Sequence, residues 1–594
     1  MRCLSLFALV LTASACTQPL TIAPSDAATV LAHRSLEAPD PGAPGPLPVR
    51  FLYYGSGKDI RRPEYRDSIS YRTPTVDASA FARMSPRLAR ERDAYWGYGN
   101  KAFPLNARVW YPAGEGPFPL VLVVHGNHDM KDFSDPGYAW LGEFLASRGY
   151  ILASIDQNFL NGNLPRDEFD ARGWMLLKHL EVFRALNDSI GKPLHRKVDM
   201  TRIVLMGHSR GGEAVAIAAL FNRLTHYPDD ATQRFDFGFD IKGIVSIAGV
   251  DNYYKPAGKY LPIENLNYLA FHGSHDGDVA SFMAMAAYNR VRYTRPGSEF
   301  KSAIWMHRAN HGQWNTVWGN TDNGPTSGRA LRLDALISGE EQRQFGRVAI
   351  GAFLDITLKG RNEYRALFRD HRTAGDWLPP SMYITRYADA RTQYLATFEE
   401  DVDVTTGSLP GVRISTEGLT TWREGDTPAR SRTPTLQSTI ATFGWNAVRK
   451  EGTPPARVSV HLPDSLRTAW QIGATHALTL SVGTLRASGA SDSVPPDLTV
   501  EVEDTAGRTA RLPLSTFGPV RYPIDSYVYR RRGRDRTQFT TLAETILYTY
   551  VAPLSQFAAT GTGFDPAQLR TIRLVFDRRP SGSVVVDDVG VGRE

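Results

Sequence analysis

The sequence predicts an α/β domain with a doubly wound, mostly parallel sheet, followed by an all-β sandwich. Two observations lead to this prediction. From about residue 49 to residue 360, short apolar strands alternate with amphipathic helices, which is typical of a parallel sheet covered on both faces. After residues 372–380, period-two alternation dominates and turn residues separate the segments, which is typical of an antiparallel sandwich.

The first residues, MRCLSLFALVLTASAC, have the layout of an export signal. Arg2 precedes an apolar stretch over residues 4–11, and small residues follow. The stretch is too short to span a membrane. Cleavage before Cys16 with lipidation of its thiol predicts a membrane-anchored bacterial lipoprotein, and simple cleavage at the same bond predicts a periplasmic or secreted protein. We expect no other contact with a membrane.

Composition excludes several classes of protein. Cys3 and Cys16 are the two cysteines of the chain, so a mature exported form has no internal disulfide, no thiol nucleophile and no cysteine metal site. Its stability has to come from apolar cores. A formal charge of +6 over 594 residues is a mild basic bias, and no nucleic-acid-binding motif is present. We expect no nucleic acid partner.

Changes in residue composition and pattern along the chain predict its domain organisation. The stretch APDPGAPGPLP, at residues 38–48, is typical of an extended tether. We therefore expect a signal peptide at 1–15, a Pro-rich tether at 16–48, a catalytic α/β domain at 49–370, a linker at 371–380 and a β-sandwich at 381–594.

Each predicted element comes from a local pattern. Continuous apolar runs predict buried parallel strands, at 119–126, 151–156, 202–206, 241–249, 267–273 and 302–307. Amphipathic runs predict helices at 140–150, 174–188, 210–224 and 346–360. Period-two alternation predicts sandwich strands, at 456–462, 476–485, 497–504, 571–577 and 583–591.

The segment VLMGHSRGGEA predicts a nucleophile. A strand ends at Gly207, and a helix begins directly after Ser209. Glycines at positions 207 and 211 remove the Cβ atoms that would collide in so tight a turn. This Gly-x-Ser-x-Gly pattern lifts the serine hydroxyl above the edge of the sheet, at a helix N-terminus that favours a developing negative charge.

A serine nucleophile of this kind needs an acid and then a histidine later in the chain. His311 lies in a loop after the last predicted strand, whereas His307 is expected on that strand as a core residue. Asp276 follows the strand at 267–273 and is our candidate acid. Asp278 in the same loop and Asp251 after the preceding strand are the alternatives.

Two backbone amides are expected to hold the oxyanion. One is the amide of Arg210, directly after the nucleophile, and the other is the amide of Asn127, with His128 as its alternative. The segment HGNHD around these residues does not have the spacing of a zinc protease motif. We expect no catalytic metal and no cofactor.

The hexapeptide Gly-His-Ser-Arg-Gly-Gly and the lead-in YPAGEGPFPLVLVVHG resemble the α/β-hydrolase superfamily. They are similar to its chlorophyllase, dienelactone-hydrolase and polyester-hydrolase-like branches, over about residues 50–360. The resemblance implies hydrolysis of carboxylic esters through an acyl-enzyme. The nucleophile is Ser209, where true dienelactone hydrolases have a cysteine.

The last strands, TIRLVFD and SGSVVVDDVGV, resemble those of carbohydrate-binding or galactose-binding-like jelly-roll modules. That resemblance leaves open a structural calcium ion at Asp587 or Asp588. The segment YVYRRRGRDR, at 527–536, predicts a solvated hairpin tip, with an anionic polymer or lipid head groups as alternative partners.

These inferences predict an exported serine hydrolase that acts on a carboxylic ester, either small or part of a polymer or glycan. A peptidase on the same fold would need the same three residues. A surface adhesion protein with an inert hydrolase domain is the alternative that is not an enzyme. The acyl group, the alcohol and the oligomeric state stay open.

Overall fold

The computed structural model describes residues 20, 22–162, 168–322, 327–431, 436–446, 452–485 and 497–593. The predicted export signal and Cys16 lie outside the described residues. Within them, no helix is both long and apolar enough to cross a membrane.

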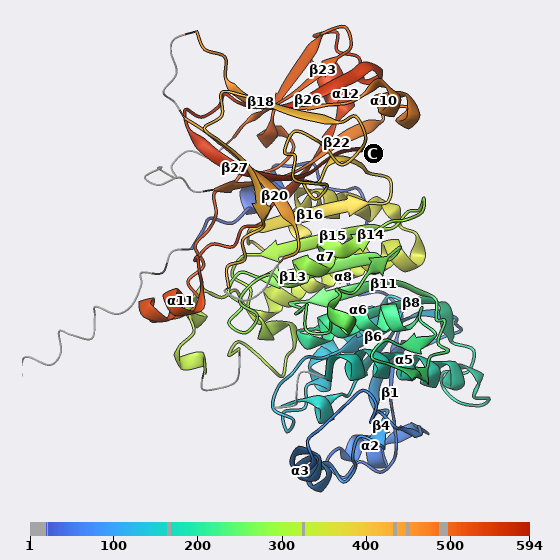
Figure 1. The fold of residues 1–594 in the computed structure, drawn as a ribbon. Coiled ribbons are helices and arrows are strands. Elements are labelled where there is room, and N and C mark those ends of the chain that lie inside the picture. Colours follow the sequence, from blue (N-terminus) through green and yellow to red (C-terminus); the bar gives the residue numbers. More distant parts are fainter. Residues whose placement is uncertain are drawn as a thin grey trace, which may run out of the picture.

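A ten-stranded sheet forms the centre of the first region, in the order β16-β15-β13-β11-β8-β6-β7-β5-β1-β2 (Figure 1). Neighbouring strands from β15 to β7 are parallel, whereas β5 and β16 run antiparallel to their neighbours. The predicted α/β fold is thus confirmed. The strands are β1 (Val49–Gly55), β2 (Ile69–Arg72), β5 (Ala107–Pro112), β6 (Phe118–Val124), β7 (Ile151–Ile155), β8 (Val198–His208), β11 (Ile241–Ile247), β13 (Asn267–Gly273), β15 (Phe300–Met306) and β16 (Tyr383–Asp389).

Helices cover both faces of this sheet and enclose two hydrophobic cores. Successive side chains of a strand point to opposite faces, so Leu120 and Leu122 of β6 enter one core while Val121 and Val123 enter the other. This explains why β6 is apolar throughout. One face is covered by α4 (Ala139–Ser147) and α8 (Gly339–Lys359), and the other by α5 (Glu168–Asp188), α6 (Arg210–Phe221) and α7 (Ala284–Arg290).

The Pro-rich segment at residues 26–48 lies against the first region and differs from the extended tether that its composition predicts. It contains a short helix, α1 (Ala27–Leu31). The Leu36 amide donates to the Thr373 carbonyl over 2.8 Å, and the Tyr364 hydroxyl donates to the Pro39 carbonyl over 2.8 Å. Backbone groups of this segment therefore find partners on the folded protein rather than in water.

Asp26 anchors the start of this segment. Its side chain is buried and accepts hydrogen bonds from the Tyr383 amide over 3.0 Å and from His371 Nε2 over 3.1 Å. The carboxylate also pairs with Arg521. One buried acid thus joins the N-terminal segment to both regions of the chain.

The junction between the regions contains regular structure. Most of the predicted linker is a 3₁₀ helix, η9 (His371–Trp377). The strand that follows, β16, pairs with β15 along its full length and is the edge of the large sheet. The α/β region therefore extends to Asp389, 19 residues past its predicted end at residue 370, because its edge strand lies far along the chain from the rest of the sheet.

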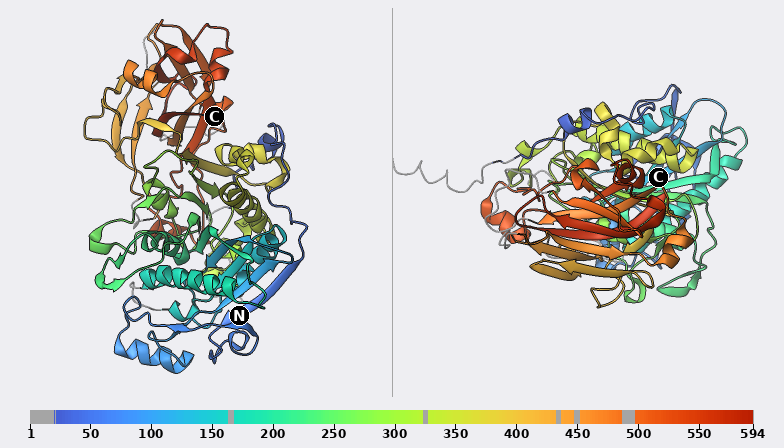
Figure 2. Two further views of the ribbon diagram at one scale, coloured as in Figure 1. Left: turned by 90° about the vertical axis from the view of Figure 1, so that its right-hand side faces the viewer. Right: turned by 90° about the horizontal axis from the view of Figure 1, so that it is seen from above.

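The second region is all-β and lies at one end of the first (Figure 2). Two antiparallel sheets enclose one hydrophobic core. The first has the order β19-β20-β27-β22-β25, with β17 also paired to β27, and the second has the order β18-β21-β26-β23-β24. Their strands are β17 (Gln393–Ala396), β18 (Arg413–Glu417), β19 (Thr421–Asp426), β20 (Thr439–Trp445), β21 (Ala456–His461), β22 (His476–Leu485), β23 (Thr499–Asp504), β24 (Thr509–Pro513), β25 (Tyr548–Pro553), β26 (Leu569–Phe576) and β27 (Gly582–Arg593).

Polar contacts join β16 to the all-β region. Arg386, which is buried, lies 3.1 Å from a carboxylate oxygen of Asp587 and 2.5 Å from one of Asp588. The Arg386 guanidinium therefore binds the two carboxylates at which the resemblance to jelly-roll modules allowed a calcium ion. No group of three or more His, Cys, Asp or Glu suited to a metal occurs among the described residues.

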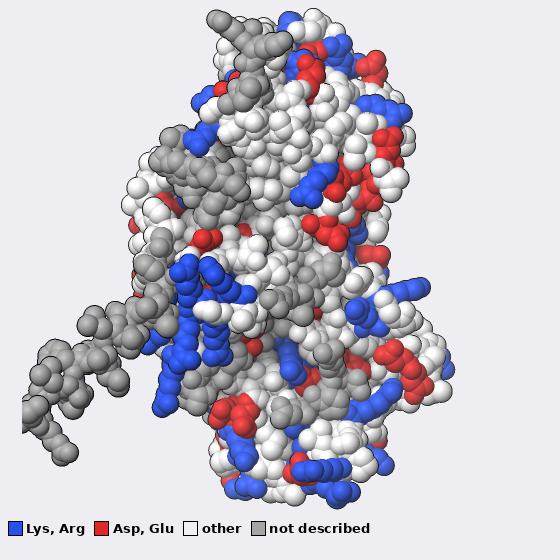
Figure 3. Space-filling view, turned by 60° about the vertical axis from the view of Figure 1, so that its left-hand side comes forward, with Lys and Arg blue, Asp and Glu red and all other residues white. Residues whose placement is uncertain are grey.

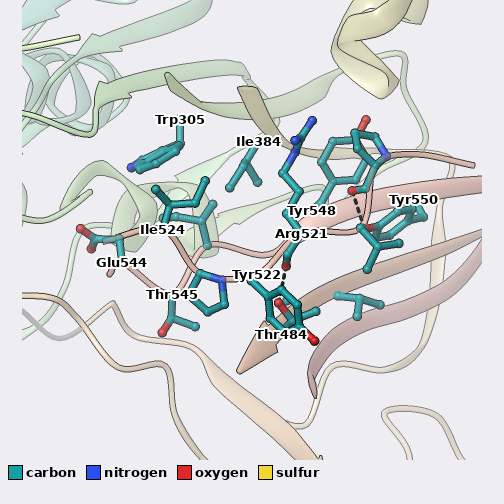
Figure 4. Close-up of a pocket in the computed structure, with 16 residues that line it drawn as sticks. Trp305, Ile384, Thr484, Arg521, Tyr522, Ile524, Glu544, Thr545, Tyr548 and Tyr550 are labelled. Atoms are coloured by element: carbon teal, nitrogen blue, oxygen red, sulfur yellow. Dashed lines mark hydrogen bonds between the residues drawn. The ribbon is translucent and has the colours of Figure 1, made fainter. Parts of the chain in front are cut away.

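A long connection between β24 and β25 reaches from the all-β region onto the α/β region. It lines a cavity of about 40 Å³ with Trp305 and Ile384 of the large sheet (Figure 4), large enough to hold about two water molecules. Farther along, the connection forms a bridge between Tyr529 and Leu331 and contains the helix α11 (Arg532–Gln538). The two regions are therefore interlocked rather than tethered.

We predict that Asp26→Ala destabilises the protein by about 2 kcal/mol, because the Tyr383 amide and the Arg521 guanidinium lose a buried acceptor. The measurement is urea-induced unfolding. Asp240→Ala is the control, since this exposed carboxylate only pairs with Lys242 and its loss should cost less than about 1 kcal/mol. Equal stability of Asp26→Ala and the wild type would show that the N-terminal segment is not anchored.

Candidate active site

Ser209 stands on a strained turn between β8 and α6. Its backbone has φ 58° and ψ −122°, a left-handed conformation that is costly for a residue with a side chain. A Cβ on Gly207 would lie 1.8 Å from the Gly211 carbonyl oxygen, and a Cβ on Gly211 would lie 2.5 Å from the Val124 carbonyl oxygen. Both glycines are therefore required by close backbone approach, as the sequence predicts.

The loop after β6 passes directly over the serine. A Cβ on Gly126 would lie 2.4 Å from the Ser209 Cβ and 2.9 Å from its Oγ. Neutral His125 fixes this turn, since its Nδ1 donates to the Gly126 carbonyl over 2.8 Å and its Nε2 accepts from the Gln157 amide over 3.0 Å. Asn127 comes next, and its side-chain oxygen accepts from the Gly162 amide over 2.8 Å. The chain at 126–127 is thus held beside the serine hydroxyl.

His311 and Asp276 form a buried pair. The Nδ1 of His311 donates to Oδ2 of Asp276 over 2.8 Å. The other carboxylate oxygen accepts from the amides of Asp278 and Val279, over 2.9 and 2.6 Å. Both oxygens of Asp276 are therefore held, and the carboxylate fixes which ring nitrogen of His311 carries the proton.

The charges around this pair shift both pKa values. Burial alone would raise the pKa of Asp276, but the His311 ring and local hydrogen bonds outweigh burial and lower it. Burial alone would lower the pKa of His311, but the charge and hydrogen bond of Asp276, followed by the charges of Asp278 and Asp322, raise it to about 9. The site therefore stabilises an imidazolium ion in its interior.

The alternative candidates lie elsewhere or play other roles. Asp278 has one carboxylate oxygen 3.6 Å from His311 Nε2, and 30% of its side chain is exposed. Asp251 forms a two-bond ion pair with Arg290, with distances of 2.7 and 2.8 Å. His307 is buried and lies 3.2 Å from the Ser274 hydroxyl, as expected of a core histidine.

The histidine loop is docked against the serine turn through His208, the residue before Ser209. The Nε2 of His208 donates to the backbone carbonyl of His311 over 3.0 Å, and Tyr138 donates to its Nδ1 over 3.1 Å. The ring of Trp318 stacks on that of His311 at 5.9 Å and 7°. The Nε2 of His311 is buried and has no hydrogen-bond partner in the described part of the chain, so its capacity to bond a hydroxyl is not used by the protein.

Two tryptophans that follow His311 in the sequence have different environments. Trp314 packs in the core against Phe271 and Phe345. Trp318 covers the histidine ring, and its indole nitrogen donates to the Ser134 hydroxyl over 2.9 Å. Only Trp318 therefore contributes to the site.

Asp322 organises the loops that carry Asp276 and His311, and no motif in the sequence indicates it. This carboxylate is buried, and burial together with the charge of Asp276 raises its pKa to about 7. Its oxygens accept from four donors at 2.8 to 3.1 Å: the amides of Gly277, His311 and Gly312, and the side-chain amide of Asn310.

A second contact that the sequence does not indicate comes from the all-β region. Arg430 is buried and donates to the carbonyls of Ser274 and Ala280, over 2.9 and 2.8 Å. These carbonyls flank the loop that carries Asp276. Glu544, also from the all-β region, accepts from the Phe282 amide over 3.2 Å and lies 3.4 Å from Arg430. The all-β region thus braces the acid loop from outside.

Arg210 and Glu213 lie three residues apart on α6 but bind different partners. The Arg210 guanidinium pairs with the buried Glu168 of α5. Glu213 accepts from the amides of Tyr253 and Tyr254 over 2.9 and 2.8 Å. The Arg210 amide stands at the first position of α6, where helical amides have no partner within the helix.

Comparison with known proteins gives matches within the α/β region. A family described as PETase, PET hydrolase-like, matches residues 97–225, which include Asn127 and Ser209. Cutinase 2 of Thermobifida cellulosilytica is 29% identical over 137 residues, which cover 23% of this chain and 47% of that protein. Cutinase cut1 of Thermobifida fusca is 29% identical over 137 residues, which cover 23% of this chain and 39% of that protein.

The bis(hydroxyethyl) terephthalate hydrolase of Streptomyces coelicolor is 31% identical over 113 residues, which cover 19% of this chain and 32% of that protein. The chain thus spans less than half the length of these curated relatives. The similarity supports the predicted resemblance to polyester-hydrolase-like enzymes for the part of the α/β region that holds the strained serine.

Proposed function

We propose that the protein is an exported serine hydrolase that cleaves carboxylic esters with Ser209, His311 and Asp276. The observation that carries this proposal is the buried Asp276–His311 pair, with 2.8 Å between the atoms that bond, docked beside a serine on a strained strand-to-helix turn. The names of the relatives, cutinases and a bis(hydroxyethyl) terephthalate hydrolase, support an ester as the substrate class.

In the proposed reaction, the Ser209 oxygen attacks the ester carbonyl while His311 Nε2 takes the hydroxyl proton. The imidazolium then gives this proton to the leaving alcohol, and the acyl-enzyme remains. Water attacks the acyl-enzyme with the same histidine as base, and the acid is released. The amides of Arg210 and Asn127 donate to the oxyanion of each tetrahedral intermediate.

The buried carboxylates favour this sequence of proton transfers. Asp276 stays ionised because the His311 ring and two backbone amides hold its pKa low. The same charge stabilises the imidazolium that forms when the serine loses its proton. The orientation of the base and the negative charge that stabilises its protonated form are therefore in place before the substrate binds.

We further propose that lipidation of Cys16 anchors the enzyme to a membrane, or that simple cleavage secretes it. The all-β region is proposed to be a jelly-roll-like sandwich that positions the enzyme on a surface, a polymer or a glycan. Two antiparallel sheets around one core support the sandwich. Its contacts with the acid loop give it a second role, as a brace for the site.

Ser209→Ala is expected to lower kcat for p-nitrophenyl esters by about 10⁵-fold, because it removes the nucleophile. A fluorophosphonate probe should label the wild type at Ser209 and leave the variant unlabelled. Peptide substrates measured alongside distinguish an esterase from a peptidase. A folded wild type that the probe does not label would contradict the proposal and favour an inert hydrolase domain.

The pH dependence of kcat/KM tests the histidine and its acid. His311 must be neutral to act as base, so activity should rise with pH up to its pKa of about 9 and level off above it. Asp276→Asn removes the charge that raises this pKa, so the rising limb should move to lower pH and the plateau should fall by about 10³-fold or more. Asp278→Asn is the control, and a larger loss in that variant would reassign the acid.

Arg430→Lys and Arg430→Gln test the brace on the acid loop. Loss of hydrogen bonds to Ser274 and Ala280 should let Asp276 shift, and kcat should fall by about 10- to 100-fold with KM nearly unchanged. The rising limb of the pH profile should also move to lower pH, which a general loss of stability would not cause. Arg386→Gln is the matched control, because Arg386 is buried at the same interface but does not touch the acid loop. An unchanged pH profile in folded Arg430 variants would contradict a positioning role.

A further inference from the structure

Five arginines form a patch on and beside α11, which we define as Arg530, Arg531, Arg532, Arg534 and Arg536. All five are exposed. The acid within this stretch, Asp535, is buried and accepts from the amides of Val528 and Tyr529, over 3.2 and 3.1 Å. The acid thus shapes the backbone and does not project among the guanidiniums. Figure 3 shows the dense group of basic side chains beside the α/β region.

The charge of the patch is not cancelled by neighbours. Arg530 donates to the Leu331 carbonyl over 2.9 Å, and Arg534 lies 5.1 Å from the centre of the Tyr529 ring. Neither partner carries a charge. In the described part of the chain, none of the five guanidiniums forms an ion pair. A concentration of like charges without counter-charges attracts anions over a range of about 10 Å.

The patch is also held in place, unlike the solvated hairpin tip that its sequence predicts. The Arg530 amide donates to the Ala330 carbonyl and the Arg332 amide to the Val528 carbonyl, both over 2.7 Å. Val528, Tyr529 and Phe539 form a small apolar cluster with Leu331 and Ala280 of the α/β region.

The patch borders the proposed active site. A Cβ on Gly277 would lie 2.9 Å from the Leu331 side chain, and Gly277 stands between Asp276 and Asp278. Burial raises the pKa of Tyr529, and the charge of Asp278 adds to the rise. The patch and the acid loop are therefore within electrostatic range of each other.

We propose that this arginine patch selects esters that carry a carboxylate away from the scissile bond. The inference rests on the proposed ester hydrolysis and deepens it by naming a substrate class. The charges at the site are asymmetric: the negative Asp278 lies beside His311, whereas the arginine patch is positive. An anionic chain end is therefore attracted to the patch and repelled by the carboxylates of the acid loop. This attraction and repulsion orient the neutral ester group toward Ser209. Half-esters and acid-ended oligomers of polyesters have this chemistry.

The test compares mono-p-nitrophenyl sebacate with p-nitrophenyl decanoate, which have the same chain length but differ in a terminal carboxylate. The variant Arg532→Gln/Arg536→Gln removes two exposed guanidiniums that form no hydrogen bond, ion pair or ring contact in the described part of the protein. We expect kcat/KM for the sebacate to fall about three- to tenfold, through KM, and that for the decanoate to stay unchanged. High salt should reduce the preference of the wild type for the sebacate in the same way.

The matched control is Arg413→Gln/Arg423→Gln, which removes two exposed arginines from β18 and β19 and should leave both esters unaffected. Equal losses on both esters, or no loss on either, would overturn the proposal. So would unchanged kinetics combined with weaker binding to phosphatidylglycerol vesicles, which would assign the patch to an anionic lipid surface. The patch variant should still cleave the decanoate, which shows that ester hydrolysis itself is intact. The proposed function fails only if the protein cleaves no ester.

Discussion

The close approach of three backbone segments around Ser209 is the constraint on which the rest of the site depends. The end of β6, the end of β8 and the start of α6 meet so closely that no Cβ fits at positions 126, 207 or 211. This contact holds the serine in a left-handed conformation, and buried packing on both sides of the sheet offsets its strain. Since the backbone of Ser209 is fixed, the other groups of the site have to be brought to it.

Buried carboxylates hold His311 near the serine turn and provide in advance the negative charge that stabilises its imidazolium form. A histidine enclosed by protein would ordinarily lose its proton more readily, yet the pKa of His311 is raised to about 9 because Asp276, Asp278 and Asp322 surround it. Asp276 orients the ring, while Asp322 ties the histidine loop to the acid loop by backbone hydrogen bonds. Asp276 thus supplies both the orienting hydrogen bond and the largest stabilising charge, and Asp278 and Asp322 add to that charge.

The sequence predicts those parts of the structure that depend on local pattern. The six parallel strands and the glycines around Ser209 follow from residues close together in the chain, whereas the order of acid and histidine is expected from the general pattern of such serine sites. Asp322 and Arg430 could not be found in this way. Each binds backbone groups of irregular loops, and Arg430 lies far in the sequence from the loop that it contacts. The edge strand β16 and the anchored N-terminal segment escaped prediction for the same reason, since their partners come from distant parts of the chain.

The contacts of Arg430 decide how the two regions can behave during catalysis. Its guanidinium is buried, donates to the carbonyls of Ser274 and Ala280, and lies 3.4 Å from the carboxylate of Glu544. Separation of the regions would expose this network and leave the acid loop without its outer support, so the all-β region cannot act as a loosely tethered accessory. Any surface or polymer that it binds is therefore presented to Ser209 in one fixed orientation. The arginine patch belongs to the same region, so the arginines also keep a fixed position relative to the site, and their electrostatic field acts on it from that position.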